Sequence, residues 1–209
     1  QAQAEVAPRR VRAGPEEAMK LSRRVTALTP SATLQAKADA EEVRRRGVDV
    51  IDFGPGEPDL DTPAPIREAA KRALDENFTH YVETAGIAEL RRGLAARFRQ
   101  DYGAEYGEDE VMVGCGAKNV LFLIAQAAFE PGDRVALYAP YWVSFPDQIR
   151  LAGAEPVVLP AAEEDAFIPR AATLERARAG GPVRAVVLNS PCNPTGTIHP
   201  SERPERSGP

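Results

Sequence analysis

The arrangement of apolar and polar positions changes near residue 110. From there the chain repeats short apolar runs, loops of small or turn-forming residues, and helical segments. Short β-branched runs bounded by turn formers are typical of buried strands. They predict strands at 111–113, 134–138, 156–159 and 183–188, with helices at 120–129, from the 139–142 loop to about 151, and at 170–179. Strands that alternate with helices predict a parallel sheet covered on both faces, an α/β fold.

The first half of the chain has a different pattern. Residues 1–18 are polar and aperiodic, which predicts a disordered extension. A helix is expected at 34–46 because Gly47 is a natural C-terminal stop, and a short strand at 48–53. Thr62 is expected to cap a helix with an apolar stripe from Ile66 to Leu74. A further amphipathic helix carries Ile87, Leu90, Leu94 and Phe98.

Composition and charge narrow the class of protein. The 209 residues are 43% hydrophobic, enough for a real core, and the net charge is −5. Without a basic block the sequence gives no indication of nucleic-acid binding. Two cysteines cannot make a disulfide framework, and no segment resembles a secretory signal or a membrane span, so we expect a cytoplasmic protein that is not in the membrane.

Three unusual loops each follow a predicted strand: 114–119, 139–142 and 189–196. The carboxyl ends of parallel strands lie at one edge of a sheet, where open α/β sheets bind their ligands. We therefore expect the three loops to converge. This convergence is the strongest argument from physical reasoning alone that the chain binds a ligand.

The loop at 114–119 leads into the N-terminus of an apolar helix. Free N–H groups, the positive end of the helix dipole and Lys118 favour a phosphate. The pattern Gly114, Gly116, Asn119 lacks the third glycine of a dinucleotide fingerprint, and it does not match a P-loop. No metal site is predicted, because the spacing of the two cysteines and two histidines matches no compact zinc motif; they are Cys115, Cys192, His80 and His199.

The other two loops offer an aromatic ring and an amide. Trp142, the single tryptophan, could stack on a flat heteroaromatic ring or could anchor the following helix in the core. Prolines at 191 and 194 hold Asn193 in a stiff frame, so its amide could read a ligand or could only bond its own backbone. Together the three loops describe a pocket for a phosphorylated planar ring.

Two further segments allow a structural and a functional interpretation. The glycine- and proline-rich segment 54–63 is a domain-joining turn or a place where a ligand approaches the backbone at Gly56. Tyr81 lies in the loop 78–86 without an apolar stripe to join. It is a surface packing residue or a ligand contact.

Four segments of this sequence resemble those of class I aminotransferases, the fold-type-I pyridoxal phosphate enzymes, and among them the bacterial aspartate aminotransferases. They are Gly56-Glu57-Pro58-Asp59, Gly116-Ala117-Lys118, Pro140-Tyr141-Trp142-Val143-Ser144 and Asn189-Ser190-Pro191-Cys192-Asn193-Pro194-Thr195-Gly196. The resemblance covers about 19–198. It implies a partial three-layer sandwich with a mostly parallel sheet, the large domain of these transferases in truncated form.

The resemblance also implies roles for individual residues. Gly116, Ala117 and Lys118 would bind the phosphate of pyridoxal 5′-phosphate, Trp142 would stack on its ring, and Asn193 would bond its phenolic oxygen. In this family the 193–194 peptide bond tends to be cis. Gly56, with Trp142 and Asn193, would contact an amino acid or a 2-oxo acid substrate. Tyr81 would reach the phosphate of a neighbouring subunit, which implies a homodimer.

The resemblance ends after Gly196, about halfway along a family chain. The Schiff-base lysine belongs to the other half, so this sequence contains no catalytic residue, and we expect no transaminase activity from this polypeptide alone. A lyase or decarboxylase of the same fold and a non-catalytic remnant remain as alternatives. The expected organisation is an extension (1–18), an amino-terminal arm with part of a small domain (19–61), a partial cofactor-binding large domain (62–197) and a divergent tail (198–209).

Overall fold

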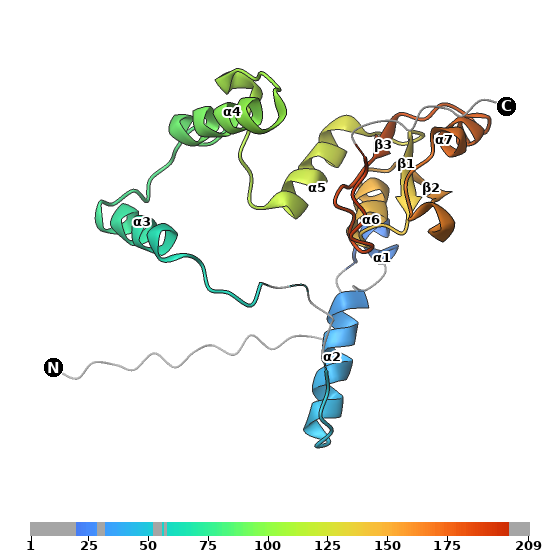
Figure 1. The fold of residues 1–209 in the computed structure, drawn as a ribbon, viewed down its shortest axis with the longest axis horizontal. Helices are drawn as coiled ribbons and strands as arrows, with labels where there is room; N and C mark the ends of the chain where they lie inside the picture. The colour runs from blue at the N-terminus through green and yellow to red at the C-terminus, as the bar shows by residue number, and fades with distance from the viewer. Residues whose placement is uncertain (1–19, 29–31, 52–55, 57, 201–209) are drawn as a thin grey trace.

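The fold is organised around a small parallel sheet. The computed structural model of the chain describes residues 20–28, 32–51, 56 and 58–200. Within them, β1 (Arg134–Ala139) lies between β2 (Glu155–Pro160) and β3 (Ala185–Val187). Both pairings are parallel, as the alternation of strands and helices predicted (Figure 1).

The central strand β1 is the most deeply buried part of the chain. Val135 and Ala136 have no exposed surface and Leu137 is 1% exposed. In the register of the sheet, Leu137 lies opposite Val158 of β2 and Val187 of β3. A strand with neighbours on both edges and helices on both faces must be apolar at successive positions, which explains the unbroken apolar run.

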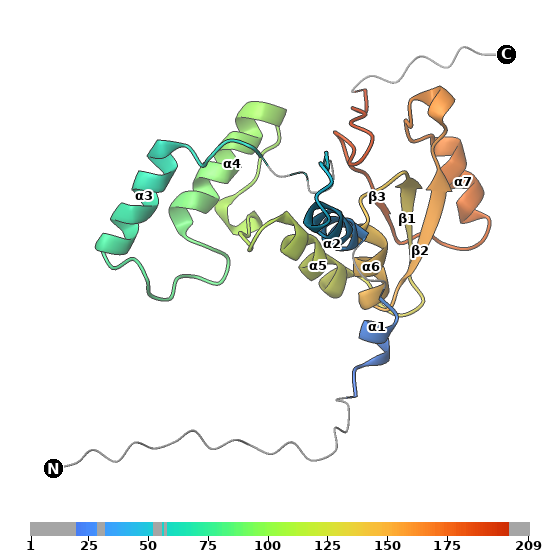
Figure 2. The ribbon, with the colours of Figure 1, turned by 90° about the horizontal axis from the view of Figure 1, so that it is seen from below.

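Helices cover the two faces of the sheet. On one face, α6 (Ser144–Leu151) packs on β1 and β2, and α5 (Ala117–Ala128) packs on α6. On the other face, α7 (Ala171–Arg178) packs on β2 (Figure 2). The main core cluster lies under α6 and consists of Val135, Leu137, Phe145, Ile149 and Ala154.

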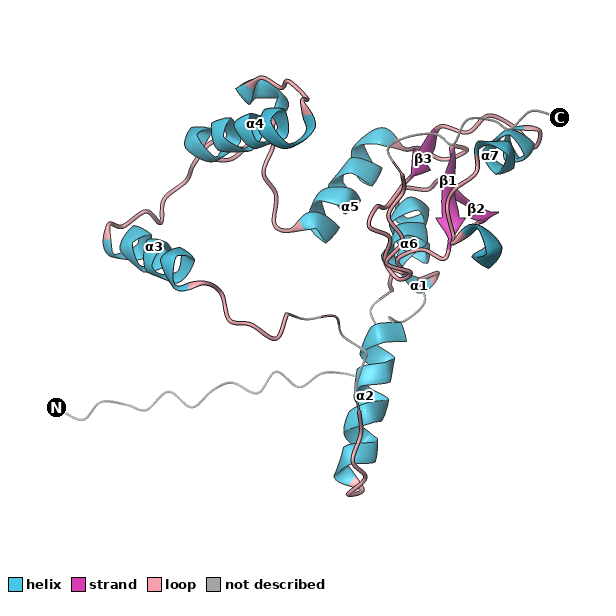
Figure 3. Cartoon of the chain, in the orientation of Figure 1, coloured by secondary structure: helices cyan, strands magenta, loops and turns pink. Residues whose placement is uncertain are grey.

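The amino-terminal helices lie mostly outside this core. The short α1 (Arg23–Thr26) contacts α6, whereas α2 (Ala32–Arg45) and α3 (Ala64–Asp75) pack extensively on no other described element. Figure 3 shows α2, α3 and the next helix, α4 (Ala88–Tyr102), well apart from the strands. Two 3-10 turns, η1 (Glu108–Glu110) and η2 (Glu163–Asp165), complete the described elements.

The predicted apolar stripes of α3 and α4 are helical apart from the N-cap Ile87, but several of their large side chains face solvent. On α3, Ile66 is 59% exposed and Leu74 is 65% exposed. On α4, Leu90 and Phe98 are both 44% exposed, although the Phe98 ring contacts those of Tyr102 and Tyr106. These helices therefore present apolar surface that the described residues do not cover.

Three local predictions were wrong. Residues 48–51 form no strand because Val48 and Ile51 are exposed and have no sheet to join; 52–53 lie outside the described residues. Residues 111–113 form no strand either, because none of the three sheet strands lies beside them. Thr62 is not the cap of α3, since the extended Pro63 precedes the first helical residue.

The other predicted elements are confirmed to within a few residues. The helix expected at 34–46 is α2, and it ends before Gly47, whose φ is +83°. The predicted extension at 1–18 and most of the predicted tail lie outside the described residues. The division at 61 and 197 stays a prediction.

Hydrogen bonds fix the C-terminal end of the loop that carries Tyr81. Arg91 of α4 is 14% exposed, and its Nε donates to the carbonyl of Gly86 at 3.0 Å. The same guanidinium donates to the Glu108 carbonyl and pairs with the Glu108 carboxylate at 3.0 Å. The Val113 N–H donates to the carbonyl of Ala85 at 2.9 Å. This cluster joins the loop to the segment that leads into α5.

Replacing Leu137 by Ala should destabilise the fold by about 3 kcal/mol, because it leaves a cavity in the central strand. Leu123→Ala on α5 is the matched control. Leu123 is 49% exposed, so its loss should change the free energy of unfolding by less than about 0.5 kcal/mol. Urea unfolding followed by circular dichroism measures both changes. Equal effects would contradict the assignment of β1 as the core strand.

Gly86→Ala should destabilise the chain by about 2–4 kcal/mol. Gly86 has φ +99°, and an added Cβ would lie 2.9 Å from the Cβ of Val113. Gly93→Ala provides a control of opposite sign, because Gly93 lies inside α4 and an added Cβ would meet nothing within 4 Å. It should stabilise the chain by about 0.5–1 kcal/mol. Thermal unfolding of both variants tests the pair, and a neutral Gly86→Ala would refute the close packing.

Candidate functional site

The predicted phosphate loop is built by glycines at the start of α5. Gly116 is the N-cap of this helix, with φ +80° and ψ 155°, and an added Cβ there would meet nothing within 4 Å. At Gly114 an added Cβ would lie 2.6 Å from Cγ2 of Val120. Gly114 therefore allows the turn to pack closely on the helix, and Gly116 supplies the positive φ at the residue that precedes it.

The first turn of α5 offers unpaired backbone donors. The N–H groups of Ala117, Lys118 and Asn119 have no partner within the helix and make no hydrogen bond to another described residue. The N–H of Gly116 is already used, since it donates to the carbonyl of Gly114 at 2.9 Å. Of the predicted phosphate residues, Ala117 and Lys118 therefore keep a donor for an anion.

Trp142 lies between the loop and the core. The Nζ of Lys118 lies 5.3 Å from the centre of the indole ring, within the range of a cation–π contact. The edge of the Phe145 ring meets the indole with the ring centroids 5.4 Å apart. Trp142 also packs against the main core cluster. Trp142 therefore anchors α6 in the core, as one of its two interpretations predicted, and part of its ring stays accessible beside Lys118. Stacking on the ring of a ligand stays a prediction.

The loop after β3 holds Asn193 through its backbone. The N–H of Asn193 donates to Oδ1 of Asn189 at 2.9 Å, and the N–H of Cys192 donates to the carbonyl of Thr197. The Asn193-Pro194 peptide bond is cis, as the family resemblance implied. The side chain of Asn193 is exposed and makes no hydrogen bond to the described residues.

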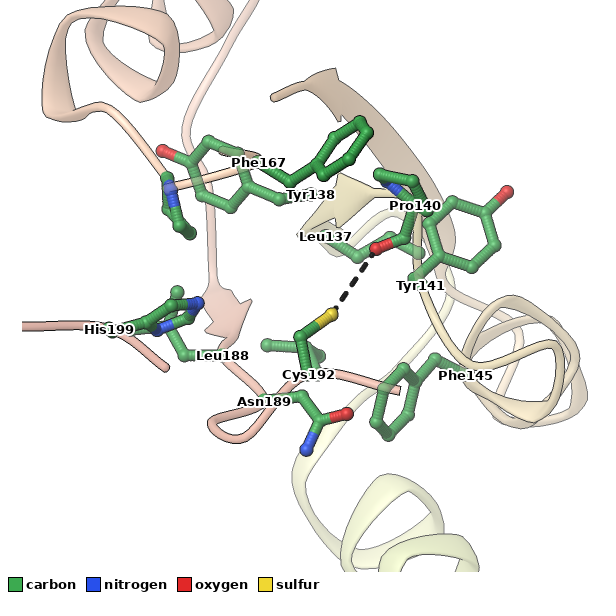
Figure 4. Close-up of a pocket in the computed structure, with 12 residues that line it drawn as sticks. Leu137, Tyr138, Pro140, Tyr141, Phe145, Phe167, Leu188, Asn189, Cys192 and His199 are labelled. Atoms are coloured by element: carbon green, nitrogen blue, oxygen red, sulfur yellow. Dashed lines mark hydrogen bonds between the residues drawn. The ribbon is translucent and has the colours of Figure 1, made fainter. Parts of the chain in front are cut away.

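The three loops meet, but only two of them follow strands. The thiol of Cys192 donates to the carbonyl of Pro140 at 3.7 Å, which joins the loop after β3 to the loop after β1 (Figure 4). The contact between Lys118 and Trp142 joins the loop after β1 to the start of α5. The expectation that the first loop also follows a sheet strand was wrong, and side-chain contacts bring it to the edge instead.

An aromatic pocket opens beside this junction, at the carboxyl ends of β1 and β3 (Figure 4). Its walls include Tyr138, Tyr141, Phe145 and Phe167. Burial raises the pKa of Tyr138, whose hydroxyl donates to the carbonyl of Arg170 at 2.8 Å. None of the residues predicted to bind a cofactor lines this pocket, although their neighbours Tyr141 and Cys192 do.

The far wall of the pocket rests on a strained turn. Ala166 and Phe167 have φ of +51° and +57°, and the hydroxyl of Thr197 donates to the Ala166 carbonyl at 2.9 Å. Arg170 pairs with Asp165 through two hydrogen bonds. These bonds lower the pKa of the Asp165 carboxyl and raise that of the Arg170 guanidinium. The turn is therefore fixed both to α7 and to the Asn193 loop.

Gly56 and Tyr81 do not join the other candidate residues. Both are exposed, and an added Cβ at Gly56 would meet nothing within 4 Å. Neither makes a hydrogen bond to another described residue. Most of the glycine- and proline-rich segment before Gly56 lies outside the described residues.

Two residues at the junction were not predicted. Gln148 is 8% exposed and lies on the inner face of α6 between Phe145 and Ile149. Its polar side chain on an otherwise apolar stripe is the sequence signal that could have revealed it. No role of its own was predicted for Asn189 within the 189–196 loop, although the side chain of an Asn at the end of a strand often bonds the backbone a few residues on.

No three His, Cys, Asp or Glu side chains of the described part gather closely enough to hold a metal ion. None of the helices in the same part combines the length and the apolar character that crossing a bilayer requires.

Proteins of similar sequence identify the family of this chain. The family described as Aminotransferase class I and II matches residues 48–204. An aspartate/prephenate aminotransferase of Thermus thermophilus is 45% identical over 182 residues, which are 87% of this chain and 47% of that protein. An aspartate aminotransferase of Bacillus subtilis is 42% identical over 184 residues, with 88% and 47% covered.

Solved structures agree in fold. The aspartate aminotransferase of Thermus thermophilus with maleate superposes with a TM-score of 0.80 at 44% identity, over 87% of this chain and 47% of that one. This chain spans about half the length of these relatives. Since the family match covers most of the sequence and the fold agrees with that of its solved members, the chain belongs to the class I and II aminotransferases.

Proposed function

We propose that this chain forms the phosphate- and ring-binding part of a pyridoxal 5′-phosphate-dependent aminotransferase. The reaction is the transfer of an amino group from an amino acid to a 2-oxo acid. The observation that carries the proposal is the position of the Lys118 ammonium, 5.3 Å from the Trp142 ring at the N-terminus of α5. The N-terminus of α5 with Lys118 could bind a phosphate group, and the adjacent Trp142 could bind an aromatic ring attached to that phosphate.

The donor set fits this cofactor. A phosphate dianion is attracted by the N–H groups of Ala117 and Lys118, by the helix dipole and by the Lys118 ammonium. The indole of Trp142 offers an aromatic face, and the free amide of Asn193 offers a donor for an oxygen on the ring. When bound, the cofactor supplies an electron sink for the carbon atom that loses or gains the amino group.

The preferred amino acid is aspartate in this proposal, because the similar proteins are aspartate or aspartate/prephenate aminotransferases. In this proposal Gly56, which lies apart from the loop junction in the free chain, contacts the carboxylate of the bound substrate through its backbone, and Trp142 and Asn193 contact the same substrate from the junction. Tyr81, whose side chain is fully exposed, reaches the phosphate of a neighbouring subunit in a homodimer. We place the protein in the cytoplasm, where its two free thiols, Cys115 and Cys192, stay reduced.

Pyridoxine 5′-phosphate, which lacks the aldehyde and forms no covalent bond to lysine, should quench the fluorescence of Trp142. Lys118→Met should weaken this binding about tenfold, because it removes a charged partner of the phosphate. The matched control is Lys71→Met. Lys71 lies on the exposed α3 and pairs only with Glu68 among the described residues, so its loss should leave the affinity unchanged. Fluorescence titration measures all three affinities.

Saturable quenching that inorganic phosphate reverses would support the proposal. No binding by the unaltered chain would contradict it. An equal loss in both lysine variants would assign the effect to general charge rather than to Lys118.

By itself, this polypeptide should transfer no amino group. Transamination needs a lysine amine that first anchors the cofactor and then carries a proton between two carbons. Lys118 is committed to the phosphate, and Lys20, Lys37 and Lys71 lie in the amino-terminal segment and on exposed helices. The measurement is a transamination assay with added pyridoxal 5′-phosphate, together with its absorbance spectrum. Turnover that disappears when a lysine of this chain is replaced would refute the prediction.

A further inference from the structure

Gln148 is the only buried polar side chain among the described residues, at 8% exposed. Its Nε2 donates to the carbonyl of Lys118 at 2.9 Å, across 30 residues of sequence. A buried amide is retained in a core only where its hydrogen bonds are satisfied. This bond therefore selects one position of α6 relative to α5.

The bond joins the two halves of the proposed site. Lys118 belongs to the first turn of α5, whose free N–H groups would bind the phosphate in the proposed function. Trp142 precedes α6 by two residues and packs on Phe145 in its first turn. A shift between the two helices would therefore change the distance and the angle between the phosphate donors and the indole.

The remaining contacts between these helices are less directional. Leu121 of α5 packs on the core cluster that includes Phe145 and Ile149 of α6. Apolar packing favours burial but tolerates small sliding and rotation better than a hydrogen bond of fixed donor and acceptor does. The contact between Lys118 and Trp142 lies at an exposed side chain, where a cation–π interaction is weak.

We propose that Gln148 is a positioning residue that sets the geometry between the phosphate-binding turn and Trp142. It acts through the Lys118 carbonyl and touches neither ligand. The inference rests on the proposed function for its ligand. The alignment of α5 and α6 that it describes is measurable in the free chain.

Gln148→Met tests the proposal, because it keeps the length and apolar stem of the side chain and removes the donor. The Lys118 carbonyl keeps its place in the hydrogen-bond ladder of α5, so the fold is retained. Gln126→Met is the matched control, since Gln126 lies exposed on α5. The probes are pyridoxine 5′-phosphate, followed by Trp142 fluorescence, and inorganic phosphate, followed by calorimetry.

Gln148→Met should weaken pyridoxine 5′-phosphate binding about fivefold, the effect of one hydrogen bond, and leave phosphate binding within about twofold. Gln126→Met should change neither. A loss of affinity for pyridoxine 5′-phosphate alone would show that Gln148 positions Trp142 relative to the α5 turn. A general loosening of the α5 turn would instead lower the affinity for both ligands alike. An equal loss of both ligands, or no loss of either, would overturn the proposal.

A second measurement needs no ligand. In Gln148→Met, acrylamide should quench Trp142 about twofold more efficiently than in the unaltered chain, because one hydrogen bond no longer holds the helix that carries the indole in place. The thermal transition should be retained, and Gln126→Met should match the unaltered chain. If the unaltered chain binds neither probe, the proposed function fails, and acrylamide quenching still decides the role of Gln148. Quenching identical in all three proteins would overturn the inference.

Discussion

The burial of β1 on both faces and along both edges is the constraint on which the rest of the structure depends. Val135, Ala136 and Leu137 are almost completely inaccessible, and this requires a strand on each side and helices above and below. Because both neighbours run parallel to β1, the loops that leave β1 and β3 emerge at the same edge. The loops of Trp142 and Asn193 are therefore neighbours as a consequence of core formation.

The third part of the site reaches this edge in a different way. Among the residues that the structure describes, no sheet strand precedes the start of α5, so the position of this helix start depends on packing against α6 and on two polar contacts. One is the hydrogen bond from Gln148 to the Lys118 carbonyl, and the other is the approach of the Lys118 ammonium to Trp142. The junction thus combines two loops fixed by the sheet with one turn fixed by a helix interface.

Sequence reasoning was most successful where the cause of structure is local. The helices from α2 to α7 and the three sheet strands follow from periodicity, and the stop of α2 follows from Gly47. It failed at 48–51 and 111–113, where apolar residues suit a strand but the described chain provides no neighbouring strand. A strand is defined by pairing with another segment, and pairing is not a property of its own residues.

The same distinction explains which site residues could be predicted. Glycines 114 and 116 determine the predicted phosphate-binding turn through their own backbone conformations, so their pattern is visible in the sequence. The role of Gln148 exists only once α5 and α6 are packed together. The proposed phosphate end thus consists mainly of backbone donors, and the proposed ring end consists mainly of side chains that pack on the core. Substitutions in the core under α6 should therefore alter the ring end first, because the donors of the α5 turn need only the helix itself.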